Sequence, residues 1–155
     1  MIRIFVDADG CPVKAEVFRV AGRHGIRVFV VANSHIKIPQ DELFELVHVE
    51  GRFDAADDWI AGESGGRDIV VTADIPLAAR CIEKGSRVLD PKGRVFTEET
   101  IGDALASREL MAYLREMGNM TGGPPPFENK DRSRFLQRLE ELIQALLRQG
   151  RAAGD

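Results

Sequence analysis

Cysteine is scarce in this sequence, which has two among its 155 residues, Cys11 and Cys81. They form no CxxC pair and no paired histidines accompany them, so neither a zinc site nor a disulfide framework is expected. Cys81 falls within a helical pattern, where a thiol usually packs as a small apolar side chain. These features exclude the zinc proteins and the small disulfide-stapled domains as readings of the chain.

Long apolar runs are also missing, and none approaches the roughly 20 residues that a membrane-spanning helix needs. The first residues lack the basic start, apolar stretch and cleavage site of a signal peptide, so we expect a cytoplasmic protein without a membrane partner. An excess of positive charge is absent too, because the formal net charge is −4. This balance argues against a protein that coats nucleic acid through bulk charge, and leaves a local basic face open.

What is present is the composition of an ordinary globular protein, with 44% hydrophobic and 30% charged residues. The length suits one domain with one core, which we place at residues 1–150. Within it, residues 1–96 are expected to form an α/β core and residues 97–150 a helical C-terminal part. Residues 151–155 are expected to be a mobile tail.

Apolar β-branched runs alternate with helical patterns over the first 96 residues. Strands are expected at 2–6, 27–33, 46–50, 68–74 and 86–90. Helices are expected at 12–25, 54–63 and 75–85, with Pro12 in the first turn and Asp54 as an N-cap. This alternation predicts a three-layer α/β sandwich with a central five-stranded parallel sheet.

The C-terminal part carries no further strand signal after residue 96. Residues 97–118 predict one or two helices opened by Thr97, and the Gly/Pro-rich residues 121–131 predict a break. The last helix has an apolar stripe made of Phe135, Leu136, Leu139, Leu142, Ile143, Leu146 and Leu147. Such a stripe is expected to pack on the sheet or on a second subunit, so a homodimer is one outcome.

Aspartates follow several of the expected strands. Asp7 and Asp9 come after the first strand, Asp74 after the fourth and Asp90 after the fifth. Because ligands of open α/β sheets bind outside the carboxyl ends of the strands, Asp7, Asp9 and Asp74 are expected to converge there if the first and fourth strands are neighbours. Whether Asp90 joins them is left open. Clustered carboxylates repel unless a cation joins them, and Mg²⁺ or Mn²⁺ prefers such oxygen ligands. The alternative is that each aspartate merely caps a helix or turns the chain.

The stretch DAADDW offers a fourth acid, and helical geometry chooses between its aspartates. Asp57 shares a face with Ile60 and Ala61, so it is expected at the packed edge and near the site. Asp58 is expected to face solvent more. A carboxylate in the first turn of a helix is also favoured by the helix dipole, and that role is compatible with the first.

Phosphate contacts are expected beside the acids. Lys14 lies in the first turn of its helix, where it either stays solvated or meets a phosphate held at the helix N-terminus. Asn33, Ser34 and His35 follow the second strand on the same rim. Asn33 joins Lys14 as a candidate phosphate contact, whereas His35 is interpreted as a loop histidine and not as a ligand.

The chain resembles the bacterial YaiI/YqxD family of small uncharacterised proteins over nearly its whole length. The matching stretches are VDADGCPVK, VVAN, DAADDWI, TADIPLAARCIEKG, LDPKGRVFTEETI and GGPPPF. The resemblance implies a PIN-like fold, related to metal-dependent ribonucleases with an acidic pocket. By position it aligns Asp7, Asp57 and Asp74 with the acids of that pocket, while Asp9 belongs to the family's own DxD signature.

The resemblance therefore implies a hydrolase in which Asp7, Asp9, Asp57 and Asp74 are both the metal ligands and the catalytic residues. Mg²⁺ or Mn²⁺ held there would activate water for attack on a phosphodiester, with RNA as the expected substrate. Further phosphate contacts are assigned to Arg115 and Arg132 on the C-terminal helices. The net negative charge differs from the basic surface that suits an RNA nuclease.

Two other functions fit parts of the same pattern. A phosphatase of the haloacid-dehalogenase type also ends a strand in DxD, with the first aspartate as nucleophile and the second as general acid. That signature usually continues to a threonine or valine where this chain has Cys11. A non-catalytic RNA- or protein-binding module would keep the fold and bind without metal.

Overall fold

The computed structural model describes residues 1–52, 54–118, 123 and 125–152. Within these ranges none of the helices is long and apolar enough to cross a membrane. The elements in chain order are β1 (Arg3–Asp7), α1 (Lys14–His24), β2 (Arg27–Ala32), β3 (Phe44–His48), α2 (Ala55–Glu63), β4 (Asp68–Val71), α3 (Ile75–Glu83), β5 (Arg87–Leu89), β6 (Val95–Phe96), α4 (Glu98–Glu116) and α5 (Asn129–Ala152).

The strands form one sheet in the order β3-β2-β1-β4-β5-β6. The first five strands are parallel, which confirms the predicted parallel sheet, and β6 pairs antiparallel with β5. The sequence did not predict β6, because two residues are too few to show a period. The chain runs from β1 outward to β3 and returns to the other side of β1 as β4. The strand order therefore reverses between β1 and β4, where α/β sheets bind ligands.

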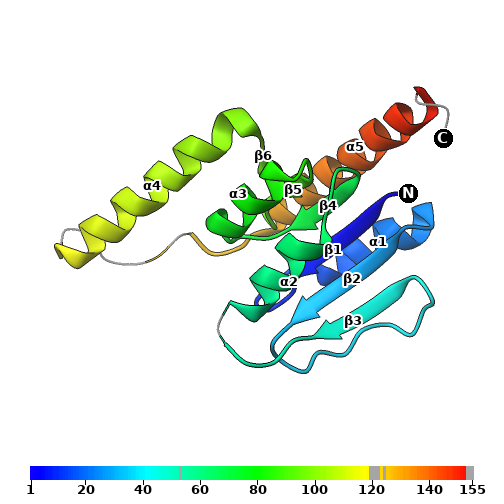
Figure 1. Ribbon diagram of the computed structural model, residues 1–155, viewed down its shortest axis with the longest axis horizontal. Coiled ribbons are helices and arrows are strands. Elements are labelled where there is room, and N and C mark those ends of the chain that lie inside the picture. The colour runs from blue at the N-terminus through cyan, green and yellow to red at the C-terminus, as the bar shows by residue number, and fades with distance from the viewer. Residues whose placement is uncertain (53, 119–122, 124, 153–155) are drawn as a thin grey trace.

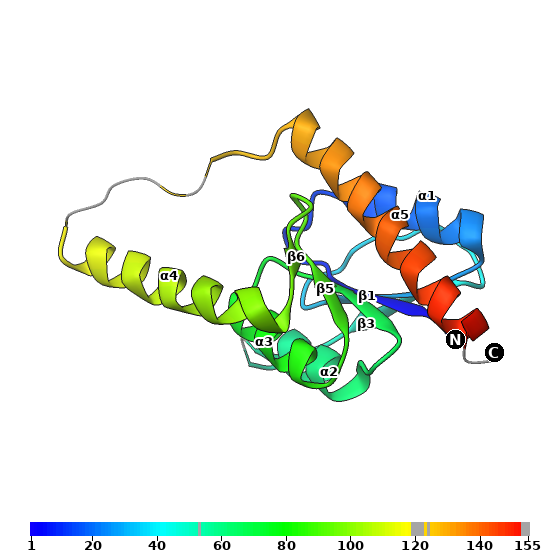
Figure 2. The same cartoon turned by 90° about the horizontal axis from the view of Figure 1, so that it is seen from above.

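Helices cover both faces of the sheet and make the predicted three layers. In Figure 2, α1 and α5 lie on one face, and α2 and α3 lie on the other. Successive side chains of a strand point to opposite faces. Ile4 and Val6 of β1 accordingly join the cluster beneath α1 and α5, while Phe5 joins the cluster beneath α2 and α3.

The two C-terminal helices behave differently from each other. The α5 helix buries Phe135, Leu139 and Ile143 in the cluster that includes β1, so the predicted stripe packs on the sheet. It continues through Ala152, and residues 153–155 lie outside the described ranges. The α4 helix begins with the predicted Thr97 cap but extends away from the sheet, as Figures 1 and 2 show. The predicted break at 121–131 falls partly outside the described residues.

One predicted helix start needs correction, and a second is confirmed in position. The first helix begins at Lys14, with Val13 as its N-cap, so Pro12 precedes it in a turn. Asp54 occupies the N-cap position of α2, but its side chain makes no capping hydrogen bond. Arg52 draws that carboxylate away, with Nε donating to Asp54 Oδ1 at 2.6 Å.

Candidate metal centre

A cavity of about 170 Å³ opens at the carboxyl edge of β1 and β4. It lies where the strand order reverses, beside the first turn of α2. Its lining consists of Asp7, Asp9, Asn33, Ala56, Asp57 and Asp74. The structure thus brings together the four aspartates that the sequence singled out, from two strand ends and one helix.

Asp7 is the last residue of β1 and is half-buried. Its Oδ2 accepts a hydrogen bond from Thr72 Oγ1 at 2.8 Å. Burial is the main cause that raises the pKa of Asp7. The Thr72 bond opposes this rise, and the nearby charges of Asp74 and Asp9 add to it. Asp7 is therefore a carboxylate whose negative charge is disfavoured by its surroundings.

Asp74 has the capping role that the bland interpretation predicted. It is the N-cap of α3, and its Oδ1 accepts a hydrogen bond from Leu77 N at 2.9 Å. Its own backbone N–H donates to Thr72 Oγ1 at 3.0 Å. Thr72 consequently links Asp7 to Asp74 across neighbouring strands. Asp74 therefore caps a helix and also lines the cavity, while its role as a metal ligand stays a prediction.

Asp9 lies in the turn after β1 and ties that turn to the end of β2. Its carboxylate accepts hydrogen bonds from the backbone N–H of Asn33 at 2.7 Å and from the hydroxyl and N–H of Ser34. The partial loss of water around Asp9 opposes ionisation, but these bonds outweigh it and lower its pKa. Gly10 follows at φ +76°, a conformation that other residues rarely adopt. Asp9 is thus ionised and held in place before any ligand arrives.

Asp57 faces the cavity and Asp58 does not, as the helical pattern predicted. Burial, followed by the charges of Asp74 and Asp7, raises the pKa of Asp57 to about 6. Asp58 instead pairs with Arg52 and with Arg80, whose Nη1 lies 2.9 Å from Asp58 Oδ1. These partners lower the pKa of Asp58. Adjacent aspartates in one turn therefore experience opposite electrostatic surroundings.

We expect Asp57→Asn to stabilise the metal-free protein at pH 7. The pKa rises from 3.8 unfolded to about 6 folded, so the ionised carboxylate costs stability as pH climbs from 4 to 6. The full shift corresponds to roughly 3 kcal/mol, which solvent screening of this half-exposed group reduces to about 1 kcal/mol. Thermal melting in EDTA should rise by about 2–4 °C at pH 7 and by nothing near pH 4.

The neighbouring substitution Asp58→Asn is the matched control for that experiment. It removes a carboxylate that two arginines already pair, so it should give no gain in melting temperature. Equal gains from the two variants would mean that repulsion inside the cavity does not act on Asp57.

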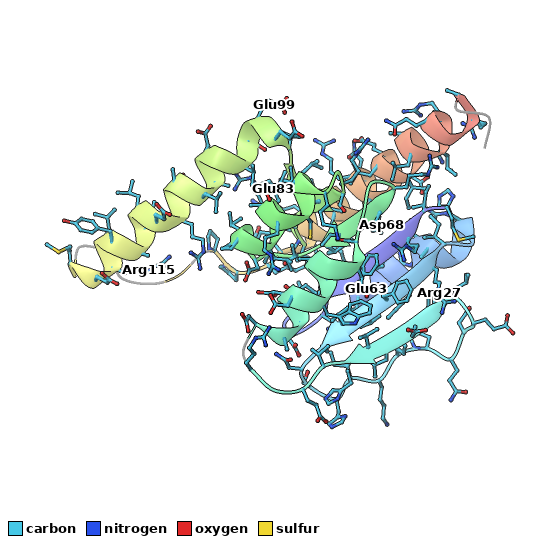
Figure 3. The ribbon with its side chains drawn as sticks, in the orientation of Figure 1. Arg27, Glu63, Asp68, Glu83, Glu99 and Arg115 are labelled. Atoms are coloured by element: carbon cyan, nitrogen blue, oxygen red, sulfur yellow. The ribbon has the colours of Figure 1, made fainter. Side chains whose placement is uncertain are left out.

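Of the four expected phosphate contacts, one lines the cavity and three do not. Asn33 lines the cavity. Lys14 Nζ donates to the carbonyl oxygens of Cys11, at 2.8 Å, and Ala8, at 3.4 Å, so it clasps the turn that carries Asp9. Arg132 pairs with Glu16 and lies over the Phe127 ring, 5.1 Å from its centroid, which ties α5 to α1. Figure 3 shows Arg115 near the end of α4 that stands away from the sheet.

Asp90 is not among the residues that line the cavity. Its Oδ1 accepts hydrogen bonds from the backbone N–H groups of Lys92 and Arg94, each at 2.9 Å. Burial raises the pKa of Asp90, and those two hydrogen bonds oppose the rise. This aspartate holds the turn between β5 and β6.

The sequence reasoning missed two features beside the cavity. One is Thr72, for which the only indication in the sequence is its position two residues before Asp74. The other is a stacked pair of rings, His35 and His48, with centroids 4.3 Å apart and planes 14° apart. His48 Nε2 lies 3.0 Å from the Asn33 carbonyl oxygen, so the pair adjoins the cavity rim through Asn33. His35 is exposed to solvent.

The donor set suits a hard cation. Its side chains are carboxylates, with an amide at Asn33, and these are the oxygen ligands that Mg²⁺ and Mn²⁺ prefer. Among the described residues, no group of three or more acids, histidines or cysteines already stands in a metal-binding arrangement. Thr72, Leu77 and Ser34 each hold one of the carboxylates by a hydrogen bond. The acids therefore share one cavity, and a bound ion would have to draw their oxygens together.

Comparison with known proteins gives one consistent result. The family model of the uncharacterized YaiI/YqxD family matches residues 5–145. A UPF0178 protein of Rhodospirillum centenum is 56% identical over 152 residues, which cover 96% of this chain and 99% of that protein. A UPF0178 protein of Nitrobacter winogradskyi is 52% identical over 147 residues, with 95% and 94% covered. No solved structure gives a significant match.

Proposed function

The chain belongs to the YaiI/YqxD family, and we propose that it is a Mg²⁺- or Mn²⁺-dependent nuclease that hydrolyses phosphodiester bonds in RNA. The observation that supports this most is the meeting of Asp7, Asp57 and Asp74 in one cavity, with the pKa values of Asp7 and Asp57 both raised. Each of the two shifts has burial as its largest cause, and neighbouring carboxylates add to both. A site that disfavours its own negative charge gains stability when a cation enters.

The residues in and beside the cavity would have different roles. Asp7, Asp9, Asp57 and Asp74 would hold the ion, which supplies an activated water and stabilises charge on the phosphate. Thr72 would position Asp7 and Asp74, since it bonds to both. Lys14 would keep the turn of Asp9 in shape through the carbonyls of Cys11 and Ala8. Asn33 is the one amide side chain among the described residues that line the cavity, and its N–H could donate to a phosphate oxygen.

A polynucleotide substrate is favoured by the pair of rings beside the cavity. His35 is exposed and stacks on His48, which contacts Asn33 of the lining. Exposed flat rings are surfaces on which unpaired bases stack in single-stranded RNA and DNA. A nucleotide whose phosphate lies in the cavity would therefore find a stacking surface close by.

The phosphatase alternative needs a general acid at Asp9. A general acid must keep its proton near the working pH, which requires a raised pKa. The hydrogen bonds from Ser34 and Asn33 instead lower the pKa of Asp9. This observation favours phosphodiester cleavage by metal-bound water over a covalent aspartyl-phosphate at Asp7.

The test has two parts, performed on the purified full chain. Calorimetric titration with Mg²⁺ and then Mn²⁺ should show saturable binding, and binding of either at millimolar metal supports the site. Labelled single-stranded RNA and p-nitrophenyl phosphate are then offered with the metal that binds, with EDTA as the control. Metal-dependent cleavage of RNA alone supports the nuclease; turnover of p-nitrophenyl phosphate alone supports the phosphatase. Absence of metal binding, or RNA binding that EDTA leaves unchanged without cleavage, overturns the proposal.

A further inference from the structure

The C-terminal part of α4 and its C-cap Met117, together residues 107–117, form an arm that leaves the body of the protein (Figures 1 and 2). Every residue of this arm is exposed except Leu114, which is half-buried. In the whole of α4 only Ala104, near its other end, is buried. The arm therefore gains little from packing within its own chain.

Large apolar side chains gather on the arm. Leu110, Met111, Tyr113 and Met117 are exposed by 53%, 38%, 58% and 58%. Among the described residues, Met1 is the one other large apolar side chain left this exposed. Soluble proteins rarely leave such a group uncovered unless it is an interaction surface.

These side chains share one face of the helix. At 100° per residue, Leu110, Leu114 and Met117 form its centre, with Met111 and Tyr113 at its two edges. The pattern also repeats after seven residues, since Ser-Arg-Glu-Leu at 107–110 becomes Leu-Arg-Glu-Met at 114–117. Apolar residues at such spacing, with charges outside them, are typical of a helix that pairs with a like helix.

The charges indicate which partner fits this face. Arg108 and Arg115 lie beyond the Met111 edge, and Glu109 and Glu116 lie beyond the Tyr113 edge. A two-fold axis running along the arms would place the arginine flank of one copy beside the glutamate flank of the other. An antiparallel pair would instead place like charges together, which is unfavourable.

We propose that the arm is a self-association surface through which two copies of this chain form a parallel helical pair. The occupant is a second copy, because the arm carries two positive and two negative charges in complementary positions. A pair of short helices makes a small interface by the standards of stable complexes. The dimer is therefore reversible and depends on protein concentration. This inference does not rest on the proposed nuclease activity.

Sedimentation equilibrium with a matched pair of variants tests the surface. Leu110→Glu puts a charge in the centre of the apolar face, and Ala112→Glu puts the same charge on the opposite face of the same turn. At about 100 µM, a concentration that populates micromolar complexes, the wild type and Ala112→Glu should approach twice the monomer mass of 17.1 kDa. Leu110→Glu should remain at 17.1 kDa. A monomeric wild type, or equal dimerisation of both variants, overturns the proposal.

Cross-linking tests the parallel arrangement. In a parallel pair Leu110 meets Leu110 of the second copy, so Leu110→Cys should give a disulfide-linked dimer when diamide is added. Ala112→Cys points away from the partner and should give none, and the native Cys11 and Cys81 are buried. A Leu110→Cys protein that dimerises by sedimentation and does not cross-link would overturn the parallel pairing.

Discussion

Asp7→Asn is expected to abolish Mn²⁺ binding in calorimetry and to lower RNA cleavage by at least about 100-fold. Even an outer partner of a metal ligand typically contributes about 10–100-fold, and Asp7 would be a ligand itself. Asparagine has the shape of aspartate and keeps an oxygen that can accept the hydrogen bond from the Thr72 hydroxyl, so the fold should persist. The loss would then reflect the missing negative charge and not unfolding. Circular dichroism of both proteins checks that point.

Asp90→Asn is the matched control. Asp90 also follows a strand of the parallel sheet, and burial raises its pKa as it does that of Asp7. It lies outside the lining of the cavity and holds the turn between β5 and β6. We expect its asparagine variant to bind Mn²⁺ with the affinity of the wild type. Unchanged metal affinity in Asp7→Asn would remove this cavity as the metal site.

The positions of the acids were accessible from the sequence because they follow local rules. Asp7 ends β1 and Asp74 follows β4 as the N-cap of α3, which places both acids at the carboxyl edge of a parallel sheet. Asp57 was chosen over Asp58 as the site residue because it shares a helical face with residues expected to be buried. Both rules depend only on spacing along the chain, and the structure agrees with both.

The partners of those acids were not accessible in the same way. Thr72 bridges Asp7 and Asp74, and Ser34 holds Asp9. The Thr72–Asp7 and Ser34–Asp9 hydrogen bonds join residues that are 65 and 25 positions apart in the chain. The arginine and lysine assignments share this difficulty, since a long side chain reaches several partners. Lys14 clasps a turn and Arg132 pairs with Glu16, and no periodicity in the chain specifies either contact.

The fold shows a similar division between local and tertiary information. The five parallel strands were recognised because apolar β-branched runs alternate with helical patterns. Among them β2 is an almost continuous apolar run, as expected of a strand buried on both faces. The stripe of α5 correctly predicted a helix packed on the sheet. The arm of α4 has an apolar face as well, yet the structure leaves that face exposed. Periodicity identifies an apolar face without stating whether its partner belongs to the same chain.

That difference between α5 and α4 leads to the second large effect, which concerns stability. Leu139 of α5 is fully buried in the cluster beneath α1, whereas Leu110 of α4 is 53% exposed. Leu139→Ala should lower the free energy of unfolding by about 2–5 kcal/mol, because it removes buried methyl groups and leaves a cavity. Leu110→Ala, the same chemical change, should alter it by no more than about 0.5 kcal/mol.

Urea unfolding followed by circular dichroism measures both values, at protein concentrations low enough for the monomer to predominate. An unchanged slope with a lower midpoint for Leu139→Ala would locate the effect in the packing of α5 on the sheet. If Leu110→Ala were equally destabilising in the monomer, the arm would have to pack within its own chain. It would then lack the free apolar face that self-association requires, so this one comparison tests the core and the arm together.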